Sequence, residues 1–110
     1  MLGHIIDAER VFGYRAFRIG RGDETPLAGF DENTYVARSA YDGIPLKELA
    51  EEFALVRGGN LATLRRLDGR HAALTGTANG AKVSVRALAY IMAGHVRHHV
   101  KGLRENYGVA

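Results

Sequence analysis

Two histidines near the end of the chain have the type and spacing that metal chemistry requires. His95 and His99 lie four residues apart inside the most apolar stripe of the C-terminal segment. Residues at i and i+4 share one face of a helix, with Cβ atoms roughly 5–6 Å apart, so two imidazoles can bind one ion at about 2.0–2.1 Å each. An unsatisfied polar group in a core costs on the order of 1–3 kcal/mol, so these rings are either hydrogen-bonded or bind a ligand.

A metal site needs further ligands, and the sequence limits where they come from. The chain has no cysteine, so histidine and carboxylate are the strong ligands that remain. The third-ligand candidates are His4, His71, Asp7 and Glu9. His4 flanks the apolar arc of the first predicted helix, whereas His71 follows Gly69-Arg70 in a polar loop and is expected to be solvated. His98 points toward the edge of the stripe, so we expect it to be exposed or to support a ligand.

Glu9 is unusual because a carboxylate falls within the apolar arc of the first predicted helix. It could pair with an arginine such as Arg15, or it could act as an acid/base group near a metal. Asp7 and Tyr14 are further acid/base candidates, and nothing in the sequence distinguishes the three. There is no cysteine and no recognisable serine motif, so any chemistry would depend on a bound metal ion.

Helical periodicity predicts the elements that must position these side chains. A long helix is expected at 2–19, a short one at 32–40, a second long one from 45 to 67, and the last at 84–107. The segment 70–83 is expected to be a loop, with Asn79-Gly80 as a turn. Helices joined by loops, without convincing strand alternation, predict an all-α helical bundle.

The composition is that of one soluble domain covering residues 1–110. Hydrophobic residues make up 46% and charged residues 25%, both ordinary values. The lack of cysteine fits a reducing cytosol, no apolar run approaches the roughly 18 residues of a membrane span, and no signal peptide is visible, so we expect a cytoplasmic protein. The net charge of +3 is mild and does not favour binding to nucleic acid.

Four short runs, in this order and spacing, resemble the DinB-like superfamily of metal-dependent four-helix proteins. They are G-H-I-I-D-A-E-R at 3–10, T-P-L-A-G-F-D-E-N-T-Y-V at 25–36, T-A-N-G at 77–80 and S-V-R-A-L-A-Y-I-M-A-G-H-V-R-H-H at 84–99. The resemblance implies that His4, His95 and His99 bind a divalent ion, zinc or nickel, with positions open for water or substrate. It also implies hydrolysis, or transfer of a low-molecular-weight thiol to an electrophile.

The chain departs from this family pattern at its start. Family members carry a helix before the histidine that matches His4, whereas this sequence begins Met1-Leu2-Gly3-His4. We therefore expect three main helices plus a short loop helix. Two hypotheses account for the difference. Either the chain is N-terminally truncated and the DNA just upstream encodes an amphipathic helix, or a second copy fills the open groove in a homodimer.

The sequence thus leaves two main functional hypotheses. The first is a divalent-metal-binding DinB-like bundle that acts on a small-molecule substrate or thiol, as a metal-dependent hydrolase or thiol transferase. The second is a non-catalytic binding or interaction module, in which the histidines are core groups hydrogen-bonded to each other or to Asn60. Nucleic-acid binding, a third interpretation, rests only on the mild basic balance and the family's historical name. Fold analogy alone does not establish an activity.

Overall fold

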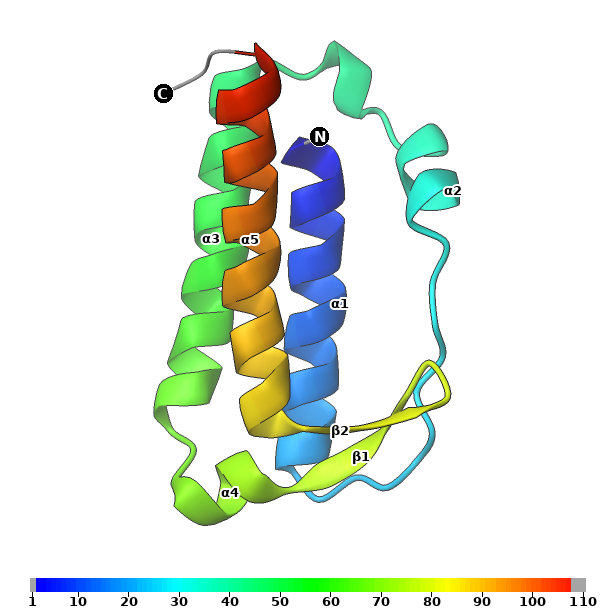
Figure 1. Cartoon of the computed structure of the whole chain (residues 1–110), viewed down its shortest axis with the longest axis vertical. Coiled ribbons are helices and arrows are strands. Elements are labelled where there is room, and N and C mark those ends of the chain that lie inside the picture. Colours follow the sequence, from blue (N-terminus) through cyan, green and yellow to red (C-terminus); the bar gives the residue numbers. More distant parts are fainter. Residues whose placement is uncertain (1, 108–110) are drawn as a thin grey trace.

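The computed structural model describes the backbone of residues 2–107 and the side chains of residues 2–97. Three long helices, α1 (Leu2–Gly20), α3 (Leu46–Arg65) and α5 (Val85–Tyr107), run alongside one another (Figure 1). α1 packs against both α3 and α5. This arrangement confirms the predicted all-α fold of three main helices plus a short helix within a loop.

The helices begin and end close to where the residues predict. Pro45 precedes the first residue of α3, and the hydroxyl of Ser84 accepts a hydrogen bond from the backbone N–H of Ala87 at the start of α5. The short helix α2 (Glu32–Ala37) is capped by Asp31, whose carboxylate accepts two backbone N–H bonds. The 3-10 turn η1 (Tyr41–Gly43) then leads toward α3.

The prediction of a plain loop over 70–83 is wrong. The chain there forms α4 (Gly69–Ala73) and an antiparallel hairpin of β1 (Thr75–Ala78) and β2 (Ala81–Ser84). Asn79 and Gly80 connect the strands with φ of 51° and 76°, the left-handed backbone of a tight hairpin turn. Each strand has only four residues, which is too short for alternation to be distinguished from chance.

The hairpin matters because it holds the long connection after α1. The backbone of Leu27 exchanges hydrogen bonds with Thr77 and Asn79, at 2.8 and 3.0 Å. This contact closes a hydrophobic cluster between α1, the connection, the hairpin and α5. Its buried members are Ala16, Ile19, Leu27, Ala78, Val85 and Leu88.

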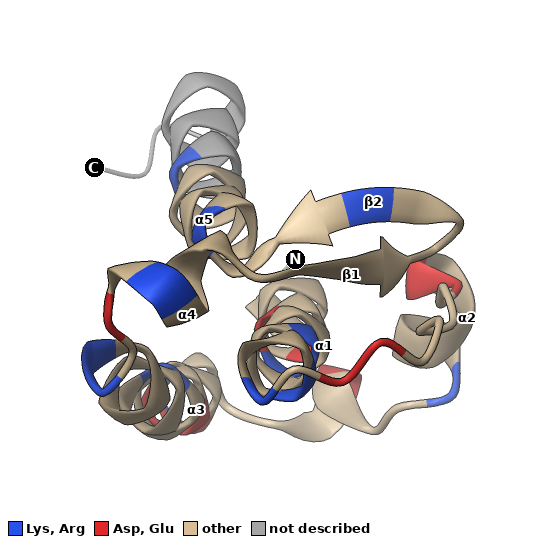
Figure 2. Cartoon of the chain, turned by 90° about the horizontal axis from the view of Figure 1, so that it is seen from below, with Lys and Arg blue, Asp and Glu red and all other residues tan. Residues whose placement is uncertain are grey.

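α1 is the central element of the molecule. Seen from below in Figure 2, it lies among α3, α5, the hairpin and α2, and it contacts each of these elements. One side of it is buried along its whole length, by Ile5, Ile6, Ala8, Ala16 and Ile19. Among the described residues, no helix combines the length and apolar character needed to cross a membrane.

Candidate metal centre

α1 and α5 bring together two histidines that are 91 residues apart in the sequence. Nε2 of His4 lies 3.1 Å from Nε2 of His95, and the two rings meet edge to face with centroids 4.9 Å apart. The side chain of His4 is 17% exposed. The Phe12 ring packs against His95 at a centroid distance of 6.0 Å, so the pair has an apolar neighbour on α1.

The separation of the two ring nitrogens has two chemical explanations. Two nitrogens that each bind one ion at about 2.0–2.1 Å are roughly 2.8–3.4 Å apart when the N–metal–N angle lies between about 90° and 109°. The observed 3.1 Å lies within that range. It is also the length of an N–H···N hydrogen bond between two neutral imidazoles, one of which donates while the other accepts.

The third predicted ligand lies further along the same helix. α5 continues to Tyr107, so residue 99 follows residue 95 by about one helical turn of its backbone. The side chains of His99 and His98 lie outside the described residues. Within the described part of the chain, no group of three His, Asp or Glu side chains converges as a metal site. The set His4, His95 and His99 therefore stays a prediction.

A carboxylate that sequence reasoning missed lies beside the pair. Oε2 of Glu32, at the start of α2, is 3.7 Å from Nε2 of His4, and the Glu32 side chain is 52% exposed. α2 contacts α1, which brings this acidic group to the histidines. The sequence feature that could have pointed to Glu32 was its position as an acidic residue in the first turn of a predicted short helix. Nothing in the sequence says which element that helix packs against.

Glu9 belongs to a buried network between α1 and α3. It is 2% exposed, and Arg57 donates to both of its carboxylate oxygens at 2.9 Å. Asn60 donates its amide to Oε2 of Glu9 at 2.8 Å and to the backbone oxygen of Glu9 at 3.0 Å. Glu9 thus pairs with an arginine, as one of the two sequence alternatives held, but the arginine is Arg57 of α3 and not Arg15. The Asn60 amide N–H groups donate to Glu9.

The other acid/base candidates also have defined partners. The Tyr41 hydroxyl donates to Asp7 at 2.6 Å, and burial together with this hydrogen bond raises the pKa of Tyr41 to about 12. Tyr14 is 54% exposed and accepts a hydrogen bond from Arg18. His71 is exposed beside Asp68 at 2.8 Å, as expected for a solvated histidine.

The fold and the paired imidazoles define a class of protein. It is a small helical bundle whose first and last long helices each contribute a histidine to one partly buried pair. The chain belongs to the DinB superfamily, whose family model matches residues 1–102. The match confirms the resemblance drawn from the four sequence runs, and it spans all three predicted ligands. No curated protein and no solved structure matches the chain significantly.

Proposed function

We propose that this protein binds one zinc or nickel ion through His4, His95 and His99. We propose further that it acts on a small molecule, either by hydrolysis or by transfer of a low-molecular-weight thiol to an electrophile. The observation that carries the proposal is the 3.1 Å separation between the Nε2 atoms of His4 and His95. A close approach of two imidazole nitrogens from opposite ends of a chain is what a shared ion needs.

The donor set fits such an ion chemically. Imidazole nitrogen suits zinc and nickel, and the chain has no thiolate that would compete for either. The spacing of 95 and 99 on one continuous helix supports the third ligand, because i and i+4 side chains can bind one ion. A bound zinc or nickel ion would lower the pKa of its water toward 7 or hold a thiol as thiolate.

Other side chains near the two histidines could take part in binding a small molecule or in transferring a proton. Glu32 places a carboxylate at the rim of the pair, where it can accept a hydrogen bond or a proton from a bound molecule. Phe12 places an apolar ring beside His95, edge to face, with the ring centroids 6.0 Å apart. Glu9 has the least support as an acid/base group, because Arg57 and Asn60 already donate hydrogen bonds to its carboxylate oxygens.

A second candidate function is favoured by the same distance. At 3.1 Å, His4 and His95 can simply hydrogen-bond to each other and serve as core groups of a non-catalytic interaction module. The two candidates differ in one measurable property, which is metal binding.

Metal content therefore tests the proposal. The purified chain, dialysed against zinc or nickel and then against buffer, is expected to retain about one ion per chain by elemental analysis. His4→Ala and His95→Ala should each lose the ion, while the matched control His71→Ala, which removes an exposed histidine, should retain it. Far-UV circular dichroism checks that each variant is folded. A folded His95→Ala chain with unchanged metal content would overturn the proposed site.

Catalysis requires a separate assay. The metal-loaded chain is expected to consume a low-molecular-weight thiol in the presence of 1-chloro-2,4-dinitrobenzene, or to hydrolyse a chromogenic ester. His95→Ala should abolish either activity. If the chain binds metal but accelerates neither reaction, the proposed metal site stands and the two proposed reaction classes are overturned.

A further inference from the structure

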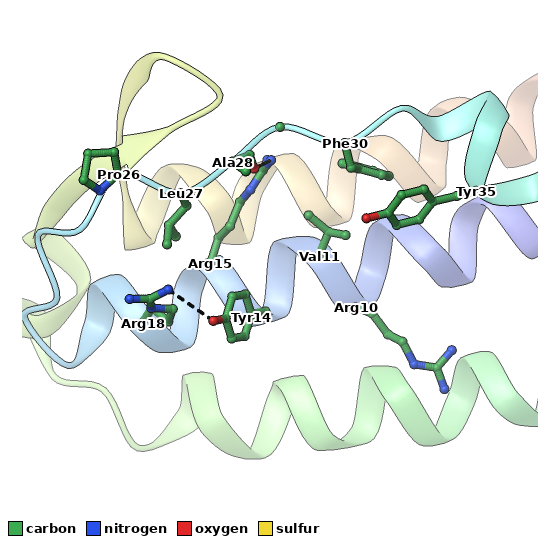
Figure 3. Close-up of a pocket in the computed structure, with 11 residues that line it drawn as sticks. Arg10, Val11, Tyr14, Arg15, Arg18, Pro26, Leu27, Ala28, Phe30 and Tyr35 are labelled. Carbon is green, nitrogen blue, oxygen red and sulfur yellow. Dashed lines mark hydrogen bonds between the residues drawn. The ribbon is translucent and has the colours of Figure 1, made fainter.

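A hollow of about 440 Å³ lies on the outer side of α1, beneath the connection to α2. α1 forms its floor through Val11, Tyr14 and Arg15, and Leu27 and Phe30 of the connection cover it (Figure 3). This volume lies within the roughly 300–1,000 Å³ that small-molecule sites occupy. The hollow involves neither His4 nor His95, and it has no role in the proposed metal chemistry.

The described residues that line this hollow carry positive charge. They include Arg10, Arg15 and Arg18, and none of them is an aspartate or glutamate. Arg10 is paired with Glu52 at 2.7 Å and Arg18 with Asp23 at 2.6 Å, so carboxylates outside the lining compensate these two arginines.

Arg15 differs from the other two arginines. Within the described part of the chain it has no ion pair, and its one hydrogen bond runs from Nη2 to the backbone oxygen of Ala28 at 3.0 Å. The residue is only 7% exposed, and burial lowers the pKa of its guanidinium. Arginine is almost never this buried without a charged partner, because removing the charge from water is unfavourable. The guanidinium carbon of Arg15 lies 5.7 Å from the Phe12 ring centroid and 5.9 Å from that of Phe30, so aromatic rings are its neighbours. No carboxylate of the described residues pairs with it, and an anionic ligand would supply that partner.

The free donors of Arg15 remain accessible to a ligand. A guanidinium has five N–H donors, and the bond to Ala28 uses one of them. No fully buried side-chain nitrogen or oxygen of the described residues lacks a hydrogen-bond partner. The other side-chain nitrogens of Arg15 are therefore accessible from the surface, where Arg15 borders this hollow and a second one near the hairpin. Two such donors in one plane match the two oxygens of a carboxylate.

Aromatic side chains complete the site. Phe30 and Tyr35 pack with ring centroids 5.2 Å apart, and Tyr14 lines the opposite part of the hollow on α1 (Figure 3). Flat apolar walls beside a guanidinium select a ligand with a planar apolar body and one negative end. We infer that the hollow between α1 and residues 26–35 binds a small aryl carboxylate, with Arg15 as the anchor for its carboxylate.

Titration with benzoate tests this inference. Benzoate should bind the metal-free chain saturably in EDTA by NMR or calorimetry, and the uncharged isostere benzamide should bind at least tenfold more weakly. EDTA separates this result from the proposed metal site, because carboxylate binding to a metal ion is then excluded. Arg15→Met removes the charge and should weaken benzoate binding at least tenfold.

Two further variants keep the test decisive if Arg15→Met fails to fold. Val11→Trp fills the hollow but leaves the guanidinium, and it should weaken benzoate binding similarly. Lys82→Met is the matched control, because Lys82 borders with Arg15 a second hollow near the hairpin; it should leave the affinity unchanged. The inference is overturned if benzamide binds as tightly as benzoate, if Val11→Trp binds normally, or if Lys82→Met loses binding.

Discussion

At the scale of single residues, the charged groups of this protein differ sharply in how much the fold depends on them. Glu9 is 2% exposed and its oxygens are held by Arg57 and Asn60, whereas Arg10 and Glu52 form an ion pair at the surface. Removing one partner of a buried pair leaves an uncompensated charge, while exposed pairs contribute little. The two ion pairs therefore offer a direct comparison on the same two helices.

Arg57→Ala is expected to lower the free energy of unfolding by about 3 kcal/mol, because it leaves the buried carboxylate of Glu9 without its charged partner. Arg10→Ala, the matched control on α1, should lower it by no more than about 1 kcal/mol. Urea denaturation of both variants measures the difference. Equal effects of the two substitutions would show that the buried network is not what couples α1 to α3.

Tyr41 makes the stability of the fold depend on pH in the alkaline range. Its pKa is raised from 10.0 to about 12, by burial and by the hydrogen bond to Asp7. Because the folded pKa exceeds the unfolded one, this contribution to stability is fully present below the unfolded pKa and is lost as pH rises through about 12. Tyr41→Phe should lower the free energy of unfolding at neutral pH by about 1 kcal/mol. The variant should also lose less stability than wild type as the pH rises through the alkaline range. Urea unfolding midpoints measured at a series of alkaline pH values test this prediction. If the midpoint of Tyr41→Phe falls with pH as steeply as that of wild type, the prediction is contradicted.

At the scale of elements, the contact between α1 and α3 depends on a missing side chain. A Cβ atom at Gly13 would collide with the Asn60 side chain, which Glu9 holds in place. Gly58 and Gly59 interrupt the apolar pattern of α3, but a Cβ added at either would meet no atom within 4 Å. Close packing therefore explains the glycine on α1 and not the pair on α3.

Gly13→Ala is expected to destabilise the bundle by about 1–3 kcal/mol through overpacking. Gly58→Ala, an identical substitution in open space, should stabilise α3 by up to about 1 kcal/mol. Opposite shifts of the urea midpoint are the expected result. If both variants moved in the same direction, the collision with Asn60 would not control the spacing of the helices.

At the scale of the whole molecule, the proposed metal site joins the first long helix to the last. An ion held by His4 and His95 would bind only the folded chain, since these residues are 91 positions apart. A homodimer that covers exposed side chains such as Leu46 and Leu55, 71% and 78% exposed, also stays a prediction at this scale.

Zinc at a hundredfold excess over its dissociation constant should stabilise the fold by about 2.7 kcal/mol, which is a rise in Tm of roughly 10 °C for a domain of this size. EDTA should reverse the rise, and His95→Ala should show none. Thermal melts followed by circular dichroism make the measurement. An equal rise in wild type and His95→Ala would mean that zinc binds elsewhere.

The residues by themselves determined the long helices, because apolar residues recur every three or four positions along each of them. In α1 that recurring set forms a buried side along the helix. They also determined which residue types could bind a metal, through the absence of cysteine and the i, i+4 spacing of His95 and His99. Only the tertiary structure decided the partners. Arg57 rather than Arg15 pairs with Glu9, Glu32 lies beside His4, and the hairpin holds Leu27. Local periodicity fixes which face of a helix is apolar, but not which distant polar side chain faces it, because that depends on how all the elements pack at once.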